Sequence, residues 1–160
     1  GARPIVEYLG GWFVQDTWRM SLPDPGAATY EAAIRGALDR AGLRPDAVDL
    51  VVPHGTGSPL LDRYEAEGIR RVFGRDVPPV TALKPYVGHT LGASALLEAG
   101  IIIQAMAEGI VPPLPDSDDL DPAIRLPVVT QPQRLRLGVA MKTVSAFAGF
   151  TAAVLFRQSR

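Results

Sequence analysis

The sequence contains no cysteine among its 160 residues. A chain without cysteine has no disulfide bridge, no thiolate zinc or iron–sulfur site, and no cysteine nucleophile of its own. Lysine is scarce as well, because only Lys84 and Lys142 represent it among the 16 basic residues. Each of these two lysines is therefore a candidate for a specific role.

An excess of one charge sign is also missing. The 16 basic and 17 acidic residues leave a net charge of −1, so we expect neither nucleic acid nor a membrane as a partner. No N-terminal stretch combines a basic start with an apolar run, which predicts a cytoplasmic protein without a signal peptide. Apolar residues make up 47% of the chain and charged residues 21%, which is typical of a folded domain.

Hydrophobic patterns typical of strands and of helices alternate along the chain. Apolar and β-branched runs predict strands at 4–13, 49–53, 80–83, 135–144 and 151–156. A spacing of three and four predicts helices at 30–41 and 90–108, and another that starts at Ser58 or Asp62 and stops before Gly74. This order predicts an α/β fold with a mixed, mostly parallel, five-stranded sheet.

The predicted helix at 90–108 is apolar on nearly every face, and we expect it to be buried in the core. It is shorter than about 20 uninterrupted apolar residues and contains Glu98 and Gln104, so a membrane span is not expected. A carboxylate buried in such a helix needs a partner, and Lys84, just before the helix, is the candidate. Glu65 lies three residues after Asp62, the spacing of a capping box, and a position near the His54 loop is the alternative.

Both histidines lie in loops that join a predicted strand to a predicted helix. His54 ends the strand 49–53, and His89 stands between the strand 80–83 and the helix at 90–108. In open α/β sheets ligands bind beyond the carboxyl ends of the strands. A helix N-terminus disfavours imidazolium, so His89 is expected to be neutral and to donate from Nε2 to a developing oxyanion. Two purely structural histidines, or a zinc site with a third ligand, remain alternatives.

Three motifs resemble, in the same order, those of the β-ketoacyl synthases, the condensing enzymes of fatty acid and polyketide synthesis. The first histidine motif is similar to His54-Gly-Thr-Gly-Ser-Pro-Leu-Leu-Asp62 followed by Glu65. The lysine and second histidine motif is similar to Lys84-Pro-Tyr-Val-Gly-His89 followed by Glu98, and the gating turn to Ala146-Phe-Ala-Gly149. The chain thus resembles the C-terminal half of such an enzyme, and its ending, 149–156, leans toward the type II polyketide branch.

The resemblance implies a mechanism, in which a cysteine of an N-terminal half takes an acyl chain from acyl carrier protein. Malonyl-carrier protein is then decarboxylated, and the carbanion attacks the thioester in a Claisen condensation. His54 and His89 would assist decarboxylation and stabilise the enolate oxygen, with Lys84 as the third catalytic residue. The resemblance assigns supporting roles to Glu98, Glu65, Thr56 and Thr90, and a gating role to Phe147.

The resemblance also implies a three-layer, thiolase-like half spanning residues 1–160, without a metal or cofactor. Its expected partners are the N-terminal half and acyl carrier protein, in a dimer of complete units. Because no cysteine is present, the chain is not expected to condense acyl chains alone. A non-condensing partner resembling a chain length factor, a decarboxylase-only homologue and an unrelated α/β binding domain are the competing hypotheses. Ala146 and Ala148 replace family glycines, and alanine resists positive φ, so a stiffer gate is expected.

Overall fold

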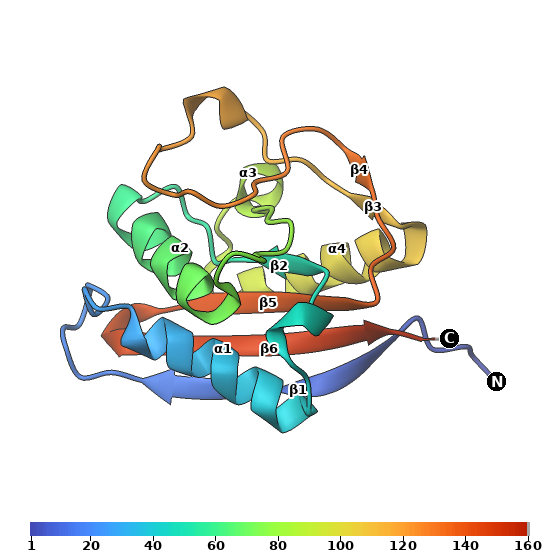
Figure 1. Cartoon of the computed structure of the whole chain (residues 1–160), viewed down its shortest axis with the longest axis horizontal. Helices are drawn as coiled ribbons and strands as arrows, with labels where there is room; N and C mark the ends of the chain where they lie inside the picture. Colours follow the sequence, from blue (N-terminus) through green and yellow to red (C-terminus); the bar gives the residue numbers. More distant parts are fainter. Residues whose placement is uncertain (160) are drawn as a thin grey trace.

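The computed structural model describes residues 1–159 and shows a sheet with helices packed on it (Figure 1). The elements follow in this order: β1 (Val6–Gln15), α1 (Ala28–Ala41), β2 (Leu50–Val52), α2 (Pro59–Phe73), α3 (Lys84–Val87), α4 (Ser94–Glu108), β3 (Ile110–Val111), β4 (Gln133–Arg134), β5 (Val139–Ser145) and β6 (Phe150–Gln158). Short 3-10 turns occupy Pro45–Ala47, Leu91–Ala93, Ser117–Asp119 and Phe147–Gly149.

The main sheet has the strand order β1-β6-β5-β2. β6 pairs antiparallel with both β1 and β5, and β2 pairs in parallel with β5. The strand expected at 80–83 is reduced to Val80, which forms isolated parallel bridges with Val51 and Val128. Pro78 and Pro79 precede Val80, and proline has no N–H to extend the ladder. The prediction of a mixed α/β sheet is confirmed. The prediction of five strands in a mostly parallel arrangement was wrong, because the main sheet has four strands and one parallel pair.

Neighbouring residues of the central strands face two different hydrophobic cores. Leu50 and Val52 of β2 pack in the core beneath α4, whereas Val51 between them packs in the core beneath α1 and α2. The same alternation occurs in β5, where Ala140 faces α4 and Met141 faces α1. Since successive side chains of a strand point to opposite faces, both faces of the sheet carry helices. This gives three layers, in agreement with the expectation.

Helices α1 and α2 end at the predicted glycines, and α2 starts after Ser58, one of its two predicted starts. Gly42, with φ +64°, closes α1 by donating its N–H to carbonyls of the last turn. Helix α2 begins at Pro59, and its N-cap residue Ser58 makes no side-chain capping bond. A proline at the first helical position has no N–H that needs a cap. Asp62 is therefore within the first turn and does not start the helix.

Helix α4 is buried on one side only, which corrects the expectation of a helix enclosed by the core. Ile102 and Met106 are buried against the sheet, whereas Leu96 and Leu97 are 79% and 47% exposed. The stretch Leu91–Glu108 has the length and apolar composition of a membrane span, a test that a core helix passes as well. Its inward face carries a charged group, Glu98, that is fully buried against this domain. The sequence could not predict the exposed side, because both sides are equally apolar.

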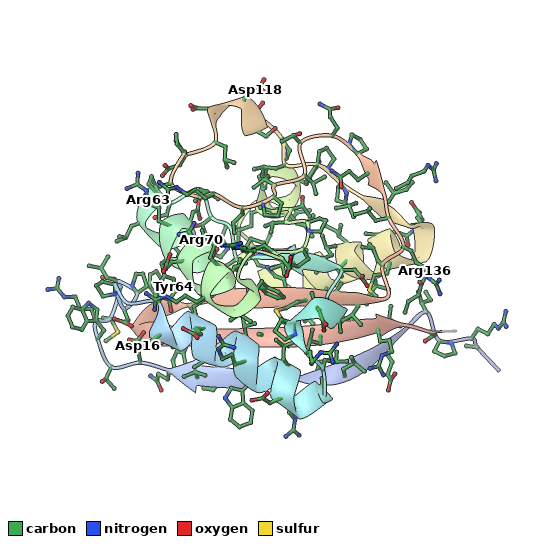
Figure 2. The ribbon with its side chains drawn as sticks, in the orientation of Figure 1. Asp16, Arg63, Tyr64, Arg70, Asp118 and Arg136 are labelled. Carbon is green, nitrogen blue, oxygen red and sulfur yellow. The ribbon has the colours of Figure 1, made fainter. Side chains whose placement is uncertain are left out.

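The acidic stretch after β3 is fastened to α2. In Figure 2, Arg63 and Arg70 extend from α2 toward this stretch. The Arg63 guanidinium forms an ion pair with Asp121 at 2.6 Å, and Arg70 donates to the carbonyls of Ala123 and Ile124. These contacts hold the loop along α2.

Candidate active site

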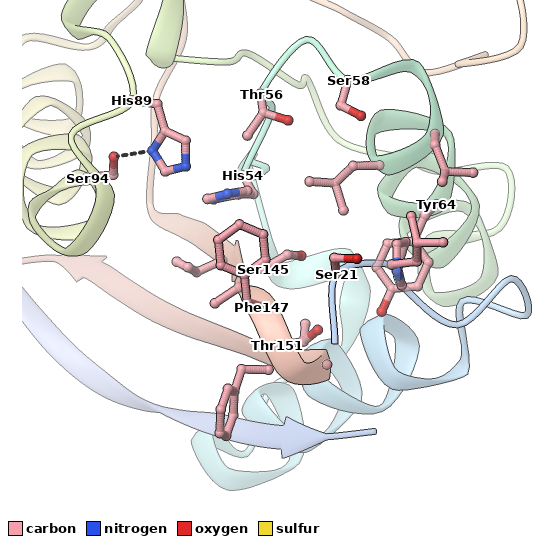
Figure 3. Close-up of a pocket in the computed structure, with 18 of the residues that line it drawn as sticks. Ser21, His54, Thr56, Ser58, Tyr64, His89, Ser94, Ser145, Phe147 and Thr151 are labelled. Carbon is pink, nitrogen blue, oxygen red and sulfur yellow. Dashed lines mark hydrogen bonds between the residues drawn. The ribbon is translucent and has the colours of Figure 1, made fainter. Parts of the chain in front are cut away.

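The structure brings the two histidines together from separate loops. Their ring centroids are 5.2 Å apart, and the ring planes are nearly perpendicular, at 85°. A cavity of about 610 Å³ opens beside both rings (Figure 3). Away from the histidines its lining is largely apolar and comes from the β1–α1 loop and α2: Met20, Leu22, Leu60, Leu61 and Tyr64. An elongated apolar substrate with one polar reacting end suits such a cavity.

His54 is held by Lys84 through both its ring and its backbone. The Lys84 ammonium donates to the His54 carbonyl and lies 3.2 Å from Nδ1. An ammonium can only donate, so Nδ1 is the acceptor and the neutral ring carries its proton on Nε2. Burial, together with the charges of Lys84 and Lys142, lowers the pKa of His54 to about 3. At neutral pH His54 is therefore an uncharged donor.

His89 has the same tautomer for a different reason. The Leu91 N–H donates to its Nδ1 at 3.3 Å. Ser94 Oγ lies 3.1 Å from Nδ1 and accepts the N–H of Thr90, which leaves the hydroxyl proton free to donate to the ring. With Nδ1 accepting twice, the neutral imidazole carries its proton on Nε2. Leu91 adopts φ +51°, an uncommon conformation for leucine, where its N–H reaches the ring.

Glu98 lies between two lysines. Its Oε1 is 2.8 Å from the Lys84 ammonium, which confirms the predicted pair, and its Oε2 forms a second ion pair with Lys142. All three side chains are almost completely buried. Lys142 comes from β5 and also donates to the Pro53 carbonyl at 2.7 Å. Burial lowers the pKa of Lys142 to about 8, against the raising effect of Glu98.

Glu65 supports the His54 loop from below and does not cap α2. Its Oε2 accepts the Gly55 N–H at 2.9 Å, and its Oε1 accepts the Ser145 hydroxyl at 3.3 Å. Burial raises the pKa of Glu65 to about 7, although the Gly55 bond and Lys142 act in the other direction. The capping-box interpretation was wrong, because the glutamate turns toward the sheet and joins the loop to β5.

The two threonines of the histidine motifs differ in their surroundings. The Thr56 hydroxyl is buried at the cavity, and it has no hydrogen-bond partner among residues 1–159. A buried hydroxyl without a partner is costly, so this group is available to a ligand. Thr90 is exposed, and its Oγ1 lies 3.3 Å from Ser94 Oγ, the hydroxyl that contacts the His89 ring.

Comparison with known proteins decides the family. The family model described as "Beta-ketoacyl synthase, C-terminal domain" matches residues 7–118. The chain belongs to this family. It is 37% identical to Nodulation protein E of Rhizobium sp. (strain N33), over 99% of this chain and 40% of that protein. It is 31% identical to 3-oxoacyl-[acyl-carrier-protein] synthase 2 of Mycobacterium bovis (strain ATCC BAA-935 / AF2122/97), over 98% of this chain and 38% of that protein.

Solved ketosynthase structures confirm the fold of this C-terminal domain. A β-ketoacyl synthase from Burkholderia phymatum STM815 matches with a TM-score of 0.91 and 32% identity, over 97% of this chain and 38% of that one. The ishigamide ketosynthase/chain length factor matches with a TM-score of 0.91 and 29% identity, over 96% of this chain and 38% of that one. The chain therefore spans about two fifths of the length of the relatives that it matches.

In this ketosynthase C-terminal domain, the turn that joins β5 to β6 closes one side of the cavity. Phe147 lines the cavity and is 73% exposed (Figure 3). The turn is tied to the β1–α1 loop, because Gly149 accepts the Asp16 N–H at 3.1 Å and Ala148 donates to the Met20 carbonyl at 2.6 Å. A Cβ at position 149 would collide with Asp16, so this position requires glycine.

The two alanines of the turn behave differently. Ala148 adopts the left-handed conformation, φ +60° and ψ +28°, whereas Ala146 is extended at φ −141°. The expected conflict between alanine and positive φ thus applies to Ala148 and not to Ala146.

Sequence reasoning missed Ser94 of this ketosynthase site, and it singled out Lys142 without finding its partner. Ser94 fixes the ring of His89, and no motif distinguishes it from other helix-start serines. Lys142 joins the Glu98 pair from β5, and the scarcity of lysine was the available signal. Its partner could not be predicted, because the contact depends on how β5 packs against α4.

Proposed function

We propose that this domain supplies the electrostatic half of a decarboxylative Claisen condensation of malonyl-carrier protein with an acyl thioester. A cysteine in an N-terminal half of the same synthase would hold that thioester. One observation carries the proposal: two neutral imidazoles, each with its proton on Nε2, lie 5.2 Å apart at one cavity. Two such donors suit a single oxygen that becomes negatively charged.

The reaction needs these donors at its first step. The bond between the malonyl carboxylate and Cα breaks, CO2 leaves, and the electron pair moves into an enolate whose charge rests on the thioester oxygen. His54 and His89 donate from Nε2 to that oxygen, which stabilises the transition state more than the substrate. The enolate Cα then attacks the acyl thioester, and the cysteine thiolate leaves. His54 stays neutral throughout, because burial and the charge of Lys84 disfavour its protonation.

An N-terminal half is proposed because of an apolar surface that this domain leaves open. Helix α4 covers the β5 side of its sheet face, and Leu96 and Leu97 point away from the sheet with exposures of 79% and 47%. On the β1 side of the same face, Tyr8 and Phe13 pack against aromatic residues of β6 and are 61% and 58% exposed. An apolar surface of this kind marks an interface. One partner layer beside α4 would cover all four side chains.

The remaining partners follow from the same proposal. Acyl carrier protein would deliver the malonyl thioester through the opening between the β1–α1 loop and Phe147, with the Thr56 hydroxyl contacting the bound thioester arm. Phe147 would gate the acyl pocket, and Glu65, Thr90 and Glu98 would support the histidines. Dimerisation of complete units stays a prediction.

A non-condensing partner subunit is the second candidate. It is favoured by Ala146 and Ala148 in the turn between β5 and β6 and by the likeness to a structure that contains a chain length factor. The intact histidine pair and its lysine argue for the first proposal, because a subunit without chemistry has no need of two aligned donors.

The test is decarboxylation of malonyl-carrier protein by the domain assembled with its N-terminal half. Alanine at His54 or His89 should each lower the rate by about 10²–10³, the usual loss for one oxyanion donor. Arg44→Ala is the matched control, since Arg44 pairs with Asp46 on the exposed surface, and it should keep the full rate. Histidine variants that retain the wild-type rate would support the non-condensing alternative.

A further inference from the structure

Lys142 is a buried charge for which neither the family motifs nor the mechanism above has a role. It is 1% exposed and lies in the middle of β5, a strand whose other inward residues are uncharged. Burying an ammonium costs several kcal/mol unless it is paired and hydrogen-bonded. Lys142 meets that requirement with Glu98 Oε2 and the Pro53 carbonyl.

The contacts of the two lysines form one closed network around the start of the histidine loop. Lys84 binds the carbonyl of His54, and Lys142 binds the carbonyl of Pro53, the residue immediately before it. The same carboxylate, Glu98, pairs with both ammonium groups through its two oxygens. Two consecutive peptide groups are thereby attached to Lys84 of α3 and Lys142 of β5, so the backbone that carries the imidazole is anchored on both sides.

The network also carries one more positive than negative charge, since two ammonium groups share a single glutamate. Lys84 alone would be balanced by Glu98, and Lys142 supplies the excess. A positive charge near His54 disfavours its protonation. Glu65 is the other carboxyl group that acts on Lys142, and it lies on the far side of the His54 loop.

We propose that Lys142 is a positioning residue for the decarboxylation step, which fixes the Pro53–His54 backbone and keeps the His54 ring an uncharged donor. This inference rests on the proposed function of His54. Lys142 does not touch the cavity, because it is absent from the lining that contains both histidines. It acts on the substrate only through His54.

Three variants separate this role from simple stabilisation of β5. Lys142→Met removes charge and hydrogen bonds at similar length, and Lys142→Gln removes the charge but keeps a donor. Thr143→Val is the matched control, because the neighbouring Thr143 is equally buried but faces the opposite core, where it bonds Tyr30. It should lower the melting temperature of the same strand without touching the network.

Two readouts apply to each variant: the pKa of His54 from ring NMR signals of the 160-residue chain, and kcat and KM for decarboxylation in the assembled synthase. For Lys142→Met we expect the pKa of His54 to rise from about 3 toward its ordinary value of about 6.5, and kcat to fall roughly tenfold with KM unchanged. Lys142→Gln should show the same pKa change with a smaller loss of kcat. Thr143→Val should change neither.

The inference is overturned if Lys142→Met and Thr143→Val lose stability and rate in parallel while the His54 pKa stays unchanged. If neither Lys142 variant folds, the wild type decides: its His54 signals should move in a step near pH 8, as Lys142 loses its proton, and absence of the step refutes the coupling. A wild-type synthase that does not decarboxylate malonyl-carrier protein refutes the proposed function instead, and leaves the pKa comparison intact.

Discussion

Replacing Glu98 by glutamine tests how much the buried charge network contributes to the stability of the domain. The variant keeps the size and shape of the side chain but removes the carboxylate with which the ammonium groups of Lys84 and Lys142 both pair. Breaking a buried ion pair in this way costs about 3–5 kcal/mol. The variant can reduce this loss of stability by releasing the proton of Lys142.

Deprotonation of Lys142 limits the loss in the free energy of unfolding and makes that loss depend on pH. Deprotonating a lysine of ordinary pKa about 10.4 costs about 4.6 kcal/mol at pH 7 and about 1.9 kcal/mol at pH 9. Unfolding entropy of about 2.1 cal/mol/K per residue gives roughly 0.34 kcal/mol/K for this chain. The expected loss of melting temperature is therefore about 9–14 °C at pH 7, and at most about 6 °C at pH 9.

Differential scanning calorimetry of both proteins at the two pH values measures this loss. Glu31→Gln is the control, because Glu31 pairs with Arg35 at 2.8 Å on the surface of α1. That pair is worth about 0.3–0.5 kcal/mol, or about 1 °C. The reasoning is refuted if Glu98→Gln loses no more than the control at pH 7, or if its deficit fails to shrink by pH 9.

Three further predictions concern the turn, the pH profile and the open apolar surface. Ala148→Gly should be more stable than Ala146→Gly by about 1 kcal/mol, because of these two positions only 148 has a positive φ. Equal melting temperatures of the two variants would contradict backbone strain at Ala148. Folding lowers the pKa of His54 from 6.5 to about 3 and raises the pKa of Glu65 from 4.5 to about 7. Between pH 4.5 and 6.5, acidification therefore destabilises the folded domain through His54 and stabilises it through Glu65. Glu65→Gln removes the opposing effect and should show a steeper fall of melting temperature on acidification than wild type, which an unchanged slope would disprove. Leu97→Asp should keep the melting temperature of the domain but weaken its binding to the N-terminal half by about 100-fold in calorimetry; unaltered affinity would place the interface elsewhere.

The sequence predicted the parts of the site that depend on local order. A strand that ends at His54 and a helix that starts after His89 place both rings at one edge of the sheet, whatever the details of the fold. The pairing of Glu98 with Lys84 was predictable for the same reason, because a carboxylate in an apolar helix must find the nearest cation.

What failed to be predicted depends on packing between distant segments. Lys142 is far from Glu98 in the chain, and only the crossing of α4 over β5 makes them partners. The exposed side of α4 was not predicted, because an apolar helix face shows that a surface must be covered. It does not show whether the same chain or another polypeptide covers it. The strand expected at 80–83 did not form fully, because Pro78 and Pro79 precede it. Whether a proline interrupts a strand depends on whether its missing N–H faces a neighbouring strand, which the sequence does not show.

The protonation state of His54 tests the central claim most directly, since the proposed chemistry requires an uncharged donor. Nitrogen-15 NMR of the wild-type ring at pH 5 should show a neutral imidazole with its proton on Nε2, in keeping with a pKa of about 3. The two histidines of the chain can be told apart with a His89→Gln variant. A His54 ring that is already an imidazolium at pH 5, with the ordinary pKa of about 6.5, would contradict the account.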